Sequence, residues 1–232
     1  MVTLNQLVYD LLELVRPNLS DDDSFDKRQI AFWIKNQRAL WLRNELNKNR
    51  TIDPNIVQDL GCIELELADK AECCDLEDGC KILRTNVTIP NTIELHNKTG
   101  ITRVAPIDKL SVPFSFVSYE RAIWSGNGKY NKNHVFAFLL NNRIYIKSND
   151  QEIAKYLTHI NVRGVFENPE EVGKFSHCSG DACYTANSNY PINSWMIDYM
   201  KDAIIKLNFA TAFKFPTDNT NNAKDDAVNE TK

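Results

Sequence analysis

The chain has 232 residues, of which 43% are hydrophobic and 25% are charged, and its formal net charge is -4. This composition is ordinary for a globular protein and is sufficient for one elaborated domain or two small ones. The excess of acidic over basic residues argues against a protein-wide positive potential that would attract nucleic acid. No apolar run approaches the roughly 18 residues needed to span a bilayer. The first residues lack the basic and apolar regions of a secretory signal, so we expect folding in a cytoplasm.

Two amphipathic helices are predicted in the first fifty residues. Thr3 and Gln6 match a capping box, and apolar residues then recur at helical spacing until Pro17 ends the helix. Asp26 is a suitable N-cap for the second helix, and the aspartates before it lie near the positive end of that helix. Its apolar stripe is wide, which indicates burial on more than one side. The predicted stripe consists of Ile30, Trp33, Ile34, Leu40 and Trp41, with Ala39, Leu42 and Leu46 on a second face.

The middle of the chain changes to the two-residue period of β-strands. Residues 62–67 alternate strictly and predict a half-solvated strand, and residues 135–140 and 143–147 flank Asn141-Asn142 as a hairpin. Asparagine tolerates the positive φ that a tight hairpin turn requires. The further predicted strands are residues 81–84, 92–95, 101–105, 112–119 and 159–166, and residues 168–171 are predicted to begin a helical turn.

The C-terminal region is again helical. Asn193 or Ser194 is a candidate cap for a helix whose apolar face carries Met196, Ile197, Met200, Ala203, Ile204 and Leu207. The polar segment after Pro216 cannot bury enough apolar surface to order by itself. The patterns predict an α+β fold with an N-terminal antiparallel helix pair, a central antiparallel β-rich body, a C-terminal helix and an extended polar tail. The predicted parts are residues 1–50, 51–190, 191–215 and 216–232, within one structural unit in which the C-terminal helix packs with the N-terminal helices.

Six cysteines raise the alternatives of metal binding and disulfide formation: Cys62, Cys73, Cys74, Cys80, Cys178 and Cys183. Two clusters are conceivable, Cys73/Cys74/Cys80 and His177/Cys178/Cys183, but their gaps differ from those of paired zinc knuckles. A reducing compartment favours free thiols, so we predict free thiols and no metal. A disulfide formed after release from a cell stays open as an alternative.

Other candidate motifs are weak. The acidic run at 20–26 lacks the glycine and the distal glutamate of a calcium loop, so helix capping is favoured. Residues 124–129 resemble a phosphate-binding loop only faintly, and a flexible loop between strands is favoured. The four histidines lack a matching nucleophile motif and are predicted to be strand or surface residues. They are His96, His134, His159 and His177. No catalytic, cofactor-binding or metal-binding residue is therefore assigned.

The second helix also carries a basic series near its aromatic residues. Basic and aromatic side chains together can bind nucleic acid. Acidic residues precede the series and the aromatic residues belong to the predicted core stripe, so a subunit interface or a solvated face is favoured. The series is Arg28, Lys35, Arg38, Arg43, Lys48 and Arg50.

A set of short motifs runs in order along most of the chain. The motifs are Ser-Asp-Asp-Asp at 20–23, residues 28–34, 37–40, 62–67, 72–74 and 80–85, and then 190–192 and 216–218 before an Asn/Asp-rich tail. In their order and spacing these motifs resemble the neck ring proteins of crAss-like bacteriophages of gut Bacteroidetes.

The resemblance implies a structural virion protein without enzymatic activity or cofactor. It implies a homo-oligomeric ring of twelve copies below the portal, connecting capsid to tail and lining the DNA channel. The implied partners are the portal protein, adjacent neck, tail ring or tail hub proteins, and genomic DNA that passes without sequence-specific binding. No membrane is implied, and assembly would occur in the bacterial host cytoplasm. The alternative function is a small nucleic-acid-binding or metal-binding domain that uses the basic side of the second helix or the cysteine clusters.

Overall fold

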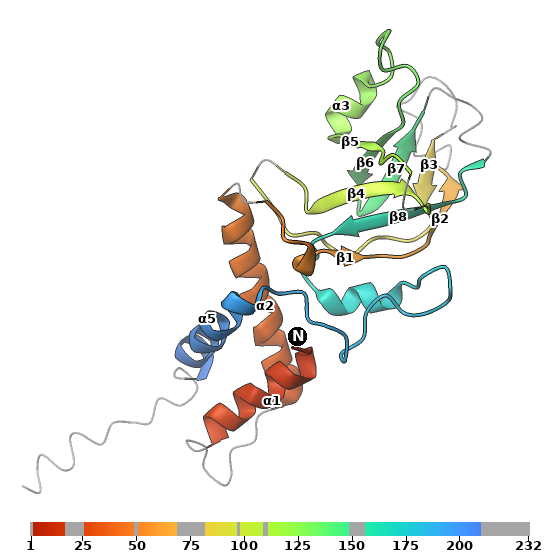
Figure 1. The fold of residues 1–232 in the computed structure, drawn as a ribbon. Coiled ribbons are helices and arrows are strands. Elements are labelled where there is room, and N and C mark those ends of the chain that lie inside the picture. The colour runs from red at the N-terminus through yellow and green to blue at the C-terminus, as the bar shows by residue number, and fades with distance from the viewer. Residues whose placement is uncertain are drawn as a thin grey trace, which may run out of the picture.

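A computed structural model describes residues 2–16, 26–48, 51–68, 82–96, 98–108, 111–148 and 156–209. Helices α1 (Leu4–Val15), α2 (Lys27–Asn47) and α5 (Ser194–Ile204) lie at one end of the molecule, and the β-strands lie at the other (Figure 1). The predicted α+β class is thereby confirmed. Within these ranges, no helix has the combination of length and hydrophobicity needed to cross a membrane.

Both N-terminal helices begin at the predicted caps. Thr3 Oγ1 accepts a hydrogen bond from the backbone N–H of Gln6 at 3.2 Å, and Gln6 Oε1 accepts one from the backbone N–H of Thr3 at 2.9 Å. These two bonds complete the predicted capping box. Asp26 Oδ1 accepts a hydrogen bond from the backbone N–H of Arg28 at 3.0 Å and caps α2. Residues 20–25 of the acidic run lie outside the described ranges.

The buried face of α2 differs from the predicted stripe. Ile30 and Ile34 are buried as predicted, but Leu40 is 51% exposed, so its assignment to the main stripe is wrong. The buried positions recur every four residues, and one of them is an arginine rather than an apolar residue. They are Ile30, Ile34, Arg38, Leu42 and Leu46.

Helix α5 packs antiparallel to α2. The ring centroids of Trp41 and Tyr199 are 6.1 Å apart, and those of Trp33 and Phe209 are 5.1 Å apart, so the two chains run in opposite directions. Phe209 ends a π-helical turn, Ile205–Phe209, that continues α5. Met196, Met200 and Ile204 of α5 are buried as predicted, but Leu207 beyond it is exposed, so its place on the apolar face is wrong. Asn193 occupies the N-cap position without a side-chain hydrogen bond.

The sheet is curled and mostly antiparallel. Its strands follow the order β1-β8-β2-β3-β7-β6-β5, and β4 pairs with β8, which also pairs with β1 and β2. Only β5 and β6 are parallel among the pairs of the described strands. The strands are β1 (Gln58–Asp59), β2 (Ile63–Leu67), β3 (Leu83–Thr85), β4 (Ile101–Pro106), β5 (Ser115–Phe116), β6 (Phe136–Leu140), β7 (Arg143–Lys147) and β8 (His159–Gly164).

The predicted hairpin is confirmed. Asn141 and Asn142 have φ values of 50° and 57°, and they join β6 to β7 with Leu140 opposite Arg143. Two positive φ values match the twist of the flanking strands, which explains why asparagines stand at the turn. The predicted helical turn is also present as the 3-10 helix η3 (Pro169–Lys174), which Asn168 caps.

Two predicted strands are largely wrong. In the predicted strand 112–119, the strand β5 is limited to two residues, and Tyr119–Trp124 form a short helix, α3. Pro113 precedes β5, and a proline lacks the backbone donor that a longer ladder requires. In the predicted strand 92–95, only Thr92 pairs, as an isolated bridge to Phe166.

One cluster of buried hydrophobic residues extends from the helices into the sheet, and η2 (Pro54–Ile56) contributes Ile56 to it. A smaller cluster lies where α3 covers β6 and β7, and it contains Ala122, Phe138 and Tyr145. The stacked rings of Phe138 and Tyr145 are 5.3 Å apart in this cluster. Helix α3 therefore packs on a small cluster of its own, at the far end of the molecule from α1 and α5 (Figure 1).

Candidate functional site

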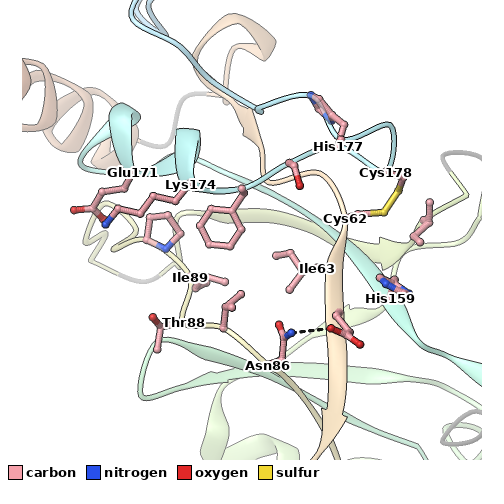
Figure 2. A pocket seen from close by; sticks show the side chains of 17 residues that line it. Cys62, Ile63, Asn86, Thr88, Ile89, His159, Glu171, Lys174, His177 and Cys178 are labelled. Carbon is pink, nitrogen blue, oxygen red and sulfur yellow. Dashed lines mark hydrogen bonds between the residues drawn. A yellow bond between two sulfur atoms is a disulfide. The ribbon is translucent and has the colours of Figure 1, made fainter.

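An open groove of about 970 Å³ is lined by β2, residues 86–90, η3 and the loop that follows η3 (Figure 2). Ile63 and Ile89 are buried in its floor. Its rim is polar, and Asn86 Nδ2 donates a hydrogen bond to Glu64 Oε2 at 2.9 Å, the dashed line in Figure 2. An open groove with an apolar floor lacks the enclosure that holds most small ligands. The charged or titratable rim residues are Glu64, His159, Glu171, Lys174 and His177.

A disulfide lies at one side of this groove. Cys62 and Cys178 are bonded, with Cα atoms 5.2 Å apart and a sequence separation of 116 (Figure 2). The prediction of free thiols is therefore wrong for these two cysteines. The backbone N–H of Cys62 donates to the carbonyl of Ser176 at 3.0 Å, so the loop after η3 is held against β2 at this point. Sequence spacing does not reveal such a long-range pairing.

Cys183 is a free thiol and lies close to the disulfide. A Cβ atom at Gly61 would lie 2.7 Å from Cys183 Sγ, and Gly61 has a φ of +68°, so both space and backbone favour glycine there. Burial, and then the nearby Asp59 carboxylate, raises the pKa of Cys183 to about 11. Cys183 is protonated at neutral pH and is not an activated nucleophile.

The described residues contain no group of three or more His, Cys, Asp or Glu side chains placed to hold a metal ion. The candidate cluster His177/Cys178/Cys183 loses Cys178 to the disulfide, and Cys73, Cys74 and Cys80 lie outside the described ranges. The fold brings two of the four histidines, His159 and His177, to the rim of one groove. His134 instead lies 6.4 Å from the Phe136 ring, and the backbone of His96 donates to Asn47.

The junction between the helices and the sheet is built around Arg38, which is fully buried. Arg38 Nε donates to the carbonyl of Pro191 at 2.7 Å, and Nη1 donates to the carbonyl of Phe166 at 2.8 Å. Nη1 also lies 3.4 Å from the carbonyl of Glu167. One side chain on α2 therefore binds both the chain after β8 and the chain that enters α5. We call Arg38 and these three carbonyls the Arg38 junction.

Two buried tyrosines complete the surroundings of the junction. The Arg38 guanidinium lies 5.7 Å from the ring centroid of Tyr190, a cation–π contact. Desolvation by burial lowers the pKa of Arg38 to about 10, so the group stays charged at neutral pH. Burial, followed by the Glu170 charge, raises the pKa of Tyr184 to about 12, and burial also raises the pKa of Tyr190. These groups form a buried structural network.

The basic series of the second helix does not form a free cationic face. Arg38 is buried, which contradicts its prediction as a solvated or interface residue. Lys35 forms an ion pair with Glu170, Arg43 lies 3.6 Å from Glu94, and Lys48 lies 2.9 Å from Glu45. Arg50 lies outside the described ranges. The spacing of four from Ile34 to Arg38 to Leu42 is the signal by which sequence reasoning could have placed Arg38 in the core.

Large exposed aromatic side chains gather at two ends of the molecule. At one end, Trp124 at the end of α3 is 79% exposed, and Tyr130 in the following loop is 86% exposed. At the other end, Trp195 and Tyr199 on α5 are 47% and 61% exposed. No sequence pattern indicates either surface. Residues 124–129 do not form the predicted loop between strands, because Trp124 ends α3 and the following residues lead to β6.

The described part of the chain thus has a buried structural network and exposed aromatic surfaces, but no catalytic constellation. The sequence matches the family model "phage tail ring protein 2" (CrAss_Ring_2) over residues 6–227. The chain therefore belongs to this family of crAss-like phage tail ring proteins, a virion component and not an enzyme, as the resemblance implied. No curated protein matches the sequence.

Proposed function

We propose that this chain forms a homo-oligomeric ring of twelve copies below the portal, where it connects the phage capsid to the tail. The observation that carries the proposal is membership of a tail ring family along residues 6–227. The partners in this proposal are the portal protein on one side and an adjacent neck, tail ring or tail hub protein on the other. Genomic DNA passes through the axial channel, and the ring assembles in the host cytoplasm.

Ring formation requires a heterologous interface, in which two different surfaces of one chain meet. The exposed aromatic residues on α5 and beyond α3 supply two such surfaces, because tryptophan and tyrosine are enriched where binding energy concentrates. Single exposed hydrophobic residues are normal on a monomer, but adjacent exposed aromatic residues such as Trp195 and Tyr199 form the kind of apolar patch that marks an interaction surface. The surface composition supports assembly for this reason.

The proposed DNA channel has an acidic or neutral wall. The formal net charge of -4 motivates this part of the proposal, because a cationic wall would hold the phosphates and slow the passage of DNA. A structure of the assembled ring tests it directly. Channel-facing residues that are mainly lysine and arginine would contradict it.

The alternative function, a nucleic-acid-binding or metal-binding domain, has less support. The described cations on α2 are buried or engaged with carboxylates, apart from Lys27 and Arg28 at its start. A binding face for phosphates needs cations that are free to replace counterions. Salt-dependent retention of the purified protein on DNA would favour this alternative, as would stoichiometric zinc in elemental analysis.

The proposal is tested by mixing the purified chain with purified portal protein. Mass measurement and low-resolution imaging of the mixture should detect rings bound to the portal. A chain that stays monomeric and unbound at every protein ratio would contradict the proposed function.

A further inference from the structure

The surface around the end of α3 combines exposed aromatic and basic side chains. We define the α3 end as Arg121, Trp124, Lys129, Tyr130 and Lys132. Trp124 and Arg121 are three residues apart in α3, so they lie on the same side of that helix. Trp124 and Tyr130 are the two most exposed large aromatic residues of the described part. Such side chains leave water at little entropic cost when a partner covers them.

The cations of the α3 end are available for a partner. The Lys129 ammonium lies 6.0 Å from the Tyr130 ring centroid, and all three cations of the α3 end are exposed. Within the described ranges no carboxylate pairs with the side chains of Arg121, Lys129 or Lys132. Glu120 is the one acidic residue between positions 119 and 134, so this surface carries net positive charge. Its complement is an acidic surface with apolar area.

Helix α5 presents a surface of that kind. We define the α5 stripe as Trp195, Asp198, Tyr199 and Asp202, whose spacing of three and four residues places them on one face of the helix. All four side chains belong to exposed residues. The opposite face of α5 is buried through Met196, Met200 and Ile204.

The aromatic part of the α5 stripe is held in place by its neighbours. The Tyr199 ring centroid lies 6.1 Å from that of Trp41 and 6.4 Å from that of Trp195. Asp202 pairs with Lys206 at 2.7 Å, an exposed contact of little energetic weight, and Asp198 makes no ion pair within the described ranges. The stripe is a supported aromatic surface with two carboxylates available to a cationic partner.

The two surfaces cannot meet within one molecule. The α3 end and α5 lie at opposite ends in Figure 1, with the sheet and α2 between them. A second copy of the chain can bring its α3 end onto the α5 stripe, and the pair then leaves one surface of each kind free for further neighbours. This is the geometry of a heterologous interface, which closes into a ring when the rotation permits.

We propose that the α3 end of one copy packs on the α5 stripe of the next copy. Trp124 and Tyr130 cover Trp195 and Tyr199, and the cations of the α3 end face Asp198 and Asp202. This inference rests on the proposed ring function and names the two surfaces that form its subunit interface. Charge complementarity favours this register over contacts between like ends, where cations would face cations.

Charge reversal tests the pairing. K129E/K132E makes the α3 end acidic, and D198K/D202K makes the α5 stripe basic. Each variant alone should lose ring assembly by at least about tenfold, because like charges then face each other. An equimolar mixture of the two variants should recover rings, since every acidic surface again meets a basic one. The control K27E/K98E, which reverses two exposed lysines elsewhere, should assemble like the unaltered chain.

The outcomes separate this inference from the proposed function. If the unaltered chain forms rings with the portal but either charge variant assembles equally well, or the mixture fails to recover, the pairing is wrong while the ring function stands. If the unaltered chain forms no ring under any condition, both are wrong. Thermal melting of each variant establishes that it is folded.

A cross-linking experiment gives a second measurement that does not depend on altered charges. Trp124 is replaced with the photoreactive residue benzoylphenylalanine. Isotope-labelled and unlabelled chains are then mixed before illumination. Cross-links between labelled and unlabelled chains that contain residues 195–202 support the pairing. Cross-links confined to other segments or to the portal overturn it.

Discussion

The Arg38 junction and the α3 end both place a cation beside a tyrosine ring, and their surroundings differ completely. Arg38 lies 5.7 Å from the Tyr190 centroid in the core, where backbone carbonyls accept its hydrogen bonds. Lys129 lies 6.0 Å from the Tyr130 centroid at the surface. A cation beside a tyrosine ring holds two parts of one chain together when it is buried. When it is exposed, it stays accessible to a partner. Burial and hydrogen bonding therefore separate the residues that hold the fold from those that serve assembly.

The largest expected effect on stability comes from the buried cation. Arg38→Ala should lower the free energy of unfolding by about 4 kcal/mol, because it leaves a cavity and removes charged donors from buried carbonyls. Arg43→Ala is the control, since its contact with Glu94 is exposed and should contribute less than about 1 kcal/mol. Urea denaturation measures both. A loss below about 1 kcal/mol for Arg38→Ala would contradict the claim that the Arg38 junction stabilises the fold.

The disulfide should give the next largest effect. The double variant Cys62→Ser/Cys178→Ser should lose about 3 kcal/mol, because the cross-link restricts a long stretch of the unfolded chain. Disulfides persist in oxidising surroundings, virion surfaces among them. Denaturation with and without reductant measures the effect, and the double variant should be insensitive to reductant. Equal stability of the unaltered chain in both conditions would show that the bond contributes nothing.

A smaller effect is expected at alkaline pH. The pKa of Cys183 is raised to about 11 in the folded state from an ordinary value near 9, so its contribution is complete below pH 9 and is lost as pH rises toward 11. Between pH 9 and 10 the loss should be below about 1 kcal/mol, because the thiol is only partly buried. The pKa of Tyr184, raised to about 12, lies above this window, whereas the pKa of Arg38, lowered to about 10, lies at its upper edge, so the comparison with Cys183→Ser is needed to isolate the thiol. Cys183→Ser should flatten the dependence, and an unchanged slope would contradict the assignment.

The segment beyond Pro216 should affect assembly and not stability. Residues 217–232 lie outside the described ranges, and deleting them should leave the unfolding curve unchanged and weaken docking to the portal, because their polar composition offers little apolar surface to bury within the chain. Co-assembly of the truncated and full chains with portal, compared at equal concentrations, measures the loss. Equal docking of the two chains would count against a role for this segment.

The sequence predicted those features that depend on neighbouring residues. The capping box at Thr3 and Gln6, the cap at Asp26 and the turn at Asn141-Asn142 are local, and the structure confirms them. The Cys62–Cys178 bond is not local, because it needs the fold to bring β2 to the loop after η3. Composition and a reducing compartment favour free thiols. The tertiary fold instead brings Cys62 and Cys178 together, and they form a disulfide.

The same limit applies to the surfaces. In the sequence, Arg38 belongs to the basic series of the second helix, and charge alone does not tell a buried arginine from a solvated one. Trp124 and Tyr130 carried no periodic signal, since they flank a glycine-containing loop. Whether an aromatic residue is in the core or at the surface depends on long-range packing. The family resemblance rests on the order and spacing of several short motifs. Arguments from helix caps, periodicity or charge do not reveal it.

The central claim is that the α3 end serves ring assembly and not folding. The oligomeric state of Trp124→Ala in the presence of portal tests this claim most directly. The substitution should change the free energy of unfolding by less than about 0.5 kcal/mol, because this tryptophan is exposed. Tyr156→Ala, at an exposed aromatic residue that belongs to neither the α3 end nor the α5 stripe, is the control and should assemble normally. Sedimentation should show a folded Trp124→Ala chain that forms few or no rings. Full ring formation by this variant would contradict the account.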